Sequence, residues 1–231
     1  MKKAGLFTIA IFSLFVTYAQ RLLSWSPEFP ADNANLTVTV DCNKGSQGLL
    51  NYEGGSSNNI YVHVGVITNL STGPTDWKYV KFTWGSTDPL AKATPLGSNK
   101  YSYSITNIRS FFGVPAGETI KKITIIFRNA SGSVKQVNSD GSDMYIPVYG
   151  ATEFAARLNL PPFEPRYDPW PEPLSVAVGN TVNTFNFLCK TFSASVGTIT
   201  NFFNPRFCLT DNNGTELSCN TTGVFDNVMY G

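Results

Sequence analysis

The residues best suited to chemistry are the aromatic side chains of residues 77–84. Read as a strand, this run alternates its side chains between two faces. The inward face takes Val80, Phe82 and Trp84. The opposite face presents Trp77, Tyr79 and Lys81. Exposed aromatic rings suit sugar binding, because the apolar face of a pyranose packs on such a ring while polar neighbours take its hydroxyls. We therefore expect Trp77 to be substantially exposed; the alternative is that Trp77 packs under a loop and Tyr79 lies along a neighbouring strand.

Familiar catalytic motifs are absent from the sequence. There is no Gly-x-Ser-x-Gly elbow, no His-Glu-x-x-His, no phosphate loop and no Cys-x-x-Cys pair. His63 is the single histidine, so a Ser-His-Asp triad would rest on one candidate. A glycosidase needs two carboxylates, but their spacing in sequence does not reveal them. We expect a chain with no catalytic site of its own and no cofactor.

A weak candidate for a metal site lies in residues 138–143. Asn138, Asp140 and Asp143 supply oxygen atoms around Gly141, loosely like a calcium loop. The terminal Glu and the full spacing of an EF-hand are missing. A polar hairpin turn is the favoured interpretation.

Period-two alternation indicates the strands that would position these groups. It recurs in residues 36–40, 60–66, 101–105, 123–127 and 144–148. Strands that each bury one face favour two antiparallel sheets packed together. The predicted fold is therefore all-β, an immunoglobulin-like antiparallel β-sandwich followed by a second, truncated β-sandwich module. Residues 107–112 are predicted to form a short helix or turn between strands.

Composition divides the chain into four parts. Residues 1–19 have a basic start, an apolar stretch and small residues before Gln20, as in a secretory signal peptide. The apolar stretch is shorter than the ~20 residues that span a bilayer, so we expect a secreted product with no membrane partner. Residues 25–149 are the predicted β-sandwich module, 150–173 a proline-rich semi-rigid linker, and 174–231 a partial second sandwich. We expect further chain beyond Gly231, which would also carry any attachment to the cell surface.

Charge and cysteine content restrict the partners and the compartment. Basic residues number 17 and acidic residues 16, which argues against nucleic acid or an anionic membrane as partner. An oxidising compartment permits disulfides. A two-residue turn at Asn213-Gly214 would place Cys208 opposite Cys219, with Cα atoms about 4.5–5.5 Å apart, within bridging range. Whether Cys42 and Cys189 are free stays open.

Several runs resemble the starch-binding modules of families 25 and 26. They are Tyr61-Val62-His63-Val64-Gly65, the later Trp77, and Ile125-Ile126-Phe127-Arg128-Asn129-Ala130-Ser131-Gly132. More closely, residues 59–149 resemble the N-terminal module of secreted α-amylase-type enzymes from Bacteroidetes. The linker and the following Ala177-Val178-Gly179-Asn180 resemble the second module of the same proteins.

This resemblance implies α-glucan binding, with a catalytic domain in the same chain beyond Gly231. His63 and Trp77 fall where such modules place a histidine and an aromatic platform. The predicted sugar-binding set is Trp77, Tyr79, His63, Lys81 and Arg128. The chain departs from the pattern at residues 134–138, where the starch modules carry Trp-Asp-Asn-Asn, so one aromatic platform is missing. Two alternatives remain open: a structural spacer or cell-surface adhesion sandwich without a sugar site, and an enzyme activity within this chain.

Overall fold

The computed structural model describes residues 21–150, 155–160, 164–168, 186–190, 193–194, 197–198, 207–210 and 216–220. The predicted signal peptide lies outside these residues. None of the helices in the described parts is long and apolar enough to cross a membrane.

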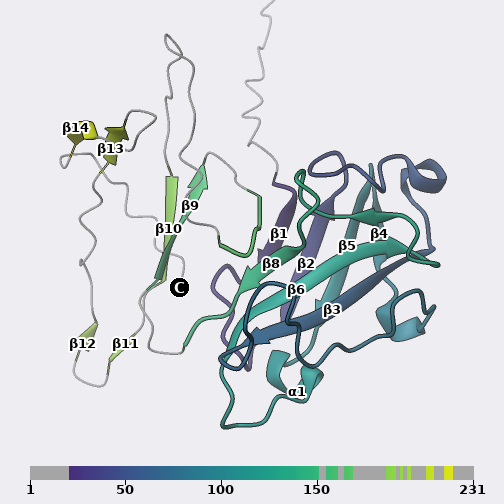
Figure 1. The fold of residues 1–231 in the computed structure, drawn as a ribbon, viewed down its shortest axis with the longest axis horizontal. Coiled ribbons are helices and arrows are strands. Elements are labelled where there is room, and N and C mark those ends of the chain that lie inside the picture. Colours follow the sequence, from purple (N-terminus) through teal and green to yellow (C-terminus); the bar gives the residue numbers. More distant parts are fainter. Residues whose placement is uncertain are drawn as a thin grey trace, which may run out of the picture.

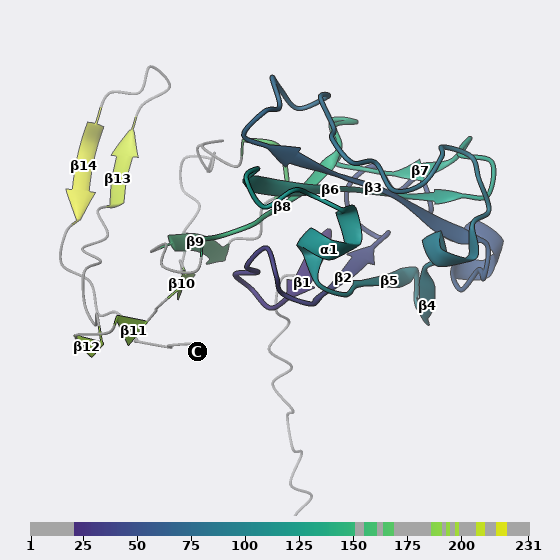
Figure 2. The same cartoon turned by 90° about the horizontal axis from the view of Figure 1, so that it is seen from below.

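Eight strands form two antiparallel sheets that pack face to face (Figures 1 and 2). The first sheet has the order β1 (Leu23–Ser26), β2 (Leu36–Asp41), β5 (Lys100–Ile105) and β4 (Thr94–Gly97). The second sheet has the order β3 (Ile60–Thr68), β6 (Ile120–Asn129) and β7 (Lys135–Gln136), and β8 (Met144–Pro147) also pairs with β6. The predicted all-β class and antiparallel sandwich are confirmed.

The space between the sheets is filled by the apolar rows that the alternation predicts. Val38 and Val40 of β2 face Val62 and Val64 of β3 across the core cluster, and all four are fully buried. Burial of a side chain of this size contributes about 1.5–3 kcal/mol. The inward rows of β5, β6 and β8 are likewise buried. The predicted parity of all five strands is therefore correct.

Short helical segments lie between the strands. The α1 helix (Ile108–Phe112) begins after Asn107, whose side chain accepts a hydrogen bond from the Ser110 amide, and ends at Gly113, where φ is 74°. Two 3-10 segments, Tyr52–Gly55 and Pro89–Ala91, lie in other connections. The short helix predicted for residues 107–112 is confirmed.

Residues 77–84 do not form a strand, so this prediction is wrong. The segment runs beside the free edge of β3, where Lys78 and Val66 exchange two backbone hydrogen bonds of 2.8 and 2.9 Å. Tyr79 then takes a left-handed conformation with φ of 50°, which interrupts the extended alternation. The segment is thus an irregular edge segment, whose side chains reach over the outer face of the second sheet.

The side chains of this segment consequently depart from the predicted parity. Phe82 is buried as expected, but Val80 and Trp84 are 43% and 42% exposed instead of facing the core. The physical reason is that the backbone follows the edge of β3, while side chains such as Trp77 turn over its outward face at His63 and Gly65.

Beyond residue 150 the described residues form three two-stranded antiparallel sheets. They are β9 (Ala155–Leu160) with β10 (Asn186–Lys190), β11 (Ser193–Ala194) with β12 (Gly197–Thr198), and β13 (Phe207–Thr210) with β14 (Glu216–Asn220). Five of these strands, β10 to β14, lie within residues 174–231, the range predicted as a partial second β-sandwich. Strand β9 lies within the range predicted as linker.

The β13–β14 pair confirms the predicted pairing of Cys208 with Cys219, although the register shifts between Leu209 and Thr210, toward the turn. Cys208 and Cys219 are direct cross-strand partners, as are Phe207 and Asn220. Cys42, in the sandwich, is a buried free cysteine. Burial, together with the negative charge of Asp41, raises the pKa of the Cys42 thiol to about 12. This thiol therefore stays protonated at neutral pH.

Candidate functional site

Three aromatic rings gather on the outer face of the second sheet. His63 projects outward from β3, and the Trp77 ring stacks on it with centroids 5.5 Å apart and planes 28° apart. Trp84 meets His63 edge-on at 5.1 Å and 84°. The structure therefore brings together His63 and Trp77, as predicted, and adds Trp84, which the parity argument had assigned to the core. We call His63, Trp77 and Trp84 the aromatic cluster.

Trp77 is held in place from two directions. The absence of a side chain at Gly65 gives the ring room, since a Cβ there would lie 3.3 Å from Trp77 Cε3 and 3.2 Å from the Lys78 carbonyl oxygen. The indole Nε1 donates a hydrogen bond of 3.0 Å to the Pro74 carbonyl oxygen. Trp77 is consequently partly buried, which differs from the substantial exposure expected.

Trp84 is the most exposed ring of the cluster. It lies against the turn at Gly132, whose φ is 77°, and a Cβ on this glycine would come within 2.7 Å of Trp84 Cε2. Below the ring, the Arg128 guanidinium carbon is 5.6 Å from the ring centroid, a cation–π distance. The glycine that closes the Phe-Arg-Asn turn was the one sequence signal for a ring at this position.

Arg128 does not present itself to a ligand. Its side chain is fully buried. The guanidinium donates hydrogen bonds of 2.7–2.9 Å to the backbone carbonyl oxygens of Ser86, Asn129 and Ala130. It also lies 5.7 Å from the Tyr61 ring centroid. The structure thus places this predicted sugar-binding residue beneath the cluster, where it supports Trp84.

Tyr79 and Lys81 do not join the cluster either. The Tyr79 hydroxyl donates a 2.5 Å hydrogen bond to Glu118 Oε2, and Thr68 donates to the other oxygen of the same carboxylate. These two bonds hold the pKa of the Glu118 carboxyl below its ordinary value. The Lys81 ammonium lies 5.2 Å from the Phe111 ring centroid. Both residues are therefore engaged within the fold.

The environment of His63 favours its neutral form. Burial lowers its pKa, the positive charge of Arg128 lowers it further, and a hydrogen bond with the Phe82 backbone works in the opposite direction. Among the described residues, its Nδ1 atom is buried without a hydrogen-bond partner. A neutral imidazole packs against the two indoles at a lower desolvation cost than an imidazolium would.

Stability should therefore depend on pH through His63. Because its pKa is lower in the folded than in the unfolded chain, the unfolded chain binds the extra proton first, and stability is lost as pH falls below the ordinary histidine value. We expect the urea midpoint to drop between pH 8 and pH 5. His63→Gln removes the one histidine of the chain and should flatten this difference; an equal drop in both proteins would contradict the assignment.

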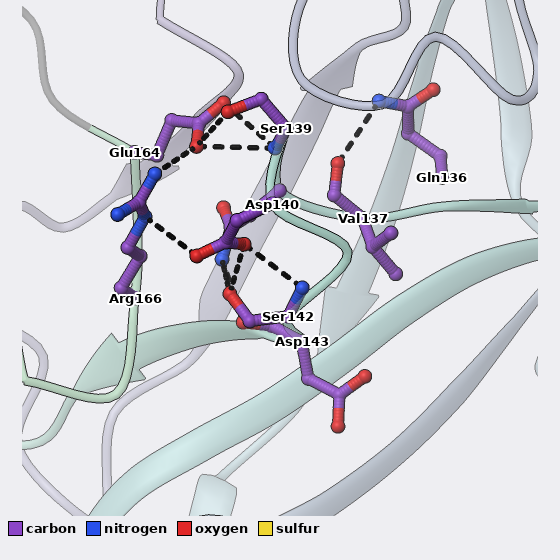
Figure 3. Close-up of polar contacts among 9 residues, drawn as sticks. Gln136, Val137, Ser139, Asp140, Ser142, Asp143, Glu164 and Arg166 are labelled. Atoms are coloured by element: carbon purple, nitrogen blue, oxygen red, sulfur yellow. Dashed lines mark hydrogen bonds and ion pairs between the residues drawn. The ribbon is translucent and has the colours of Figure 1, made fainter.

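Residues 138–143 form a polar turn, not a set of converging ligands (Figure 3), but it is not the predicted hairpin turn, because β7 and β8 on either side of it both pair with β6 and not with each other. Asp140 Oδ1 accepts hydrogen bonds from the Ser142 amide and hydroxyl at 2.9 and 2.6 Å. The Asp143 carboxylate points away from Asp140 (Figure 3). The buried Asn138 side chain donates to the Asp143 carbonyl oxygen. No three His, Cys, Asp or Glu side chains gather in a metal-holding group within the described parts of the chain.

Comparison with known proteins leaves the family open. No protein-family model matches the chain, and no curated protein matches it. An all-β fold without a match to a catalytic family is compatible with a non-enzymatic module. The aromatic cluster and the Arg128 beneath it contain no carboxylate, so the surface that they offer consists of apolar ring faces.

Proposed function

We propose that the first sandwich, predicted as residues 25–149, is a non-catalytic carbohydrate-binding module. The observation that carries the proposal is the aromatic cluster, in which His63 lies between a stacked Trp77 and an edge-on Trp84 that is 42% exposed. Indole and imidazole rings offer apolar faces to sugar C–H groups. Such a surface fits a neutral polysaccharide.

The ligand that we propose is α-glucan such as starch, at the N-terminus of a secreted glycoside hydrolase. The resemblance of residues 59–149 to modules of α-amylase-type enzymes supports this choice, as does the balanced charge of the chain. Trp84, lying on the turn that follows Phe127-Arg128-Asn129, offers a ring where the missing aromatic platform is expected. The gain from such a module is local concentration of a tethered catalytic domain at the polymer, without chemistry of its own.

The competing proposal is a structural spacer or adhesion sandwich. It is favoured by the internal engagement of Tyr79, Lys81 and Arg128, which leaves fewer polar groups free beside the rings. The aromatic cluster would then serve only to attach residues 77–84 to β3. The two proposals differ in whether a soluble oligosaccharide binds.

Calorimetric titration with maltoheptaose tests the proposal. We expect wild-type protein to bind, and Trp77→Ala to bind about tenfold more weakly, because loss of one stacked ring removes about 1–2 kcal/mol. Leu90→Ala is the control, since Leu90 is 73% exposed and belongs to the connection before β4. Absence of binding by wild type, or equal affinity of wild type and Trp77→Ala, would favour the spacer.

A further inference from the structure

Residues 164–168, from the proline-rich part of the chain, lie along the free edge of β8. The Tyr145 amide donates a 2.7 Å hydrogen bond to the Pro165 carbonyl oxygen. Strand β8 pairs with β6 on its other side, where Ile146 is opposite Ile123. Because amides alternate in direction along a strand, an outward Tyr145 amide means that the Ile146 amide points to β6. Residues 164–168 thus contact the open edge of the second sheet through one backbone hydrogen bond.

Side chains fasten both ends of this segment. At one end, Glu164 accepts hydrogen bonds from the Ser139 amide and hydroxyl at 2.8–3.1 Å, and Arg166 lies 3.3 Å from Asp140, as Figure 3 shows. At the other end, Lys122 donates to the Tyr167 carbonyl oxygen and lies 4.0 Å from the Tyr167 ring centroid.

The contacts differ in strength. Partly exposed ion pairs such as Arg166 with Asp140 contribute about 0–1 kcal/mol each. The Tyr167 ring, however, meets the buried Tyr145 edge-on at 5.3 Å and 80°, and the backbone bond closes an otherwise unpaired amide. Docking therefore depends mainly on Tyr145, Tyr167 and Lys122.

Tyr145 connects this segment to the aromatic cluster. Its hydroxyl donates a 2.9 Å hydrogen bond to the Pro74 carbonyl oxygen, the same atom that accepts the Trp77 indole at 3.0 Å. Burial, with the charge of Asp143, raises the pKa of Tyr145 to about 12, so the hydroxyl remains a donor. The Pro74 carbonyl oxygen therefore accepts hydrogen bonds both from Trp77 and from Tyr145 of β8.

We propose that residues 164–168 form a docked strap that, through Tyr145, holds Trp77 in its place in the aromatic cluster. Strap docking and ligand binding then stabilise each other, because a coupling between two sites acts equally in both directions. The ligand half of this proposal rests on the proposed carbohydrate function. The docking half, strap to Tyr145 to Trp77, does not.

Amide hydrogen exchange on the full chain tests the docking half. Lys122→Ala removes strap contacts, whereas Lys121→Ala makes the same charge change at an exposed neighbouring residue. We expect the Tyr145 amide to exchange about tenfold faster in Lys122→Ala than in Lys121→Ala, since exchange reports the undocked population. The Lys78 amide, which pairs with β3 beside Trp77, should also exchange faster. The Ile146 amide should not change.

Each outcome separates the parts of the proposal. Fast exchange of the Tyr145 amide in wild type would contradict docking of the strap. An unchanged exchange rate of the Lys78 amide in Lys122→Ala would contradict the connection to Trp77. If the Ile146 amide also exchanges faster, Lys122→Ala has loosened the sheet itself. The same measurement is then made on Tyr167→Ala, whose substitution lies within the strap. Under the coupling, either variant should weaken maltoheptaose binding about threefold. If the exchange rates change as expected but wild type binds no maltoheptaose, the docking half of the proposal is supported and the carbohydrate function is rejected.

Discussion

Replacing Arg128 with alanine is expected to lower the free energy of unfolding by about 3–5 kcal/mol. The buried guanidinium satisfies the carbonyl oxygens of Ser86, Asn129 and Ala130 and fills the space between the Tyr61 and Trp84 rings. Its removal leaves these acceptors without their donor and opens a cavity beneath Trp84. A change of this size is near the upper end for single substitutions.

Urea unfolding followed by circular dichroism measures the effect. Lys135→Ala is the matched control, because Lys135 is exposed and lies directly opposite Arg128 on β7, and its loss should change stability by less than about 0.5 kcal/mol. Arg128→Lys should recover only part of the loss, since an ammonium cannot reach three carbonyl groups in the guanidinium geometry. Unchanged stability combined with lost sugar binding would instead make Arg128 a ligand contact, as the sequence had suggested.

The sandwich itself could be predicted because its strands obey one simple rule. In residues 60–66 the row Ile60, Val62, Val64 and Val66 lies fully buried between the sheets, and the same alternation holds in β2, β5 and β6. The rule works there because each strand has one face on the core, so apolar side chains take alternate positions. The pairing of Cys208 with Cys219 was also predicted correctly, from a two-residue turn at Asn213-Gly214. The turn itself lies outside the described residues, and the register shifts between Leu209 and Thr210.

The same rule failed at residues 77–84 because it assumes that the outward face meets water. The outward face of β3 carries His63 and is covered by this segment, so there is apolar packing on both sides of the strand. Phe82 alone kept its predicted burial, while Trp84 lies at the surface. Arg128 was wrongly predicted as a sugar-binding residue for the same reason, because its side chain lies on the outward face of the sheet beneath Trp84.

The strap was beyond prediction for a different reason. Its proline content predicted an extended segment, whereas the Arg166 amide donates a 2.9 Å hydrogen bond to the Glu164 carbonyl oxygen and so forms a tight turn. Docking depends on Lys122 and Tyr145, which complement the strap only after folding. Contacts between residues more than 20 positions apart leave no periodic signal in the sequence. The same holds for the shared Pro74 carbonyl group that connects Tyr145 to Trp77.

Trp84→Ala is expected to weaken maltoheptaose binding about tenfold, and its combination with Trp77→Ala about hundredfold. Trp84 is the most exposed ring of the cluster and meets His63 at an edge, so it presents a face that Trp77 does not. Calorimetry on the two single variants and the double variant measures both effects.

The double variant also tells whether one sugar or two are held. Both tryptophans contact His63, so the two losses of affinity should add only if each ring packs on a different sugar unit. If the double variant binds as tightly as the single variants, both rings contact the same sugar unit. Trp84→Phe serves as control, because it keeps an aromatic face over Gly132 and should retain most of the affinity. If Trp84→Ala binds like wild type while Trp77→Ala does not, the ligand lies on the Trp77 side alone, and Trp84 is a cover for Arg128.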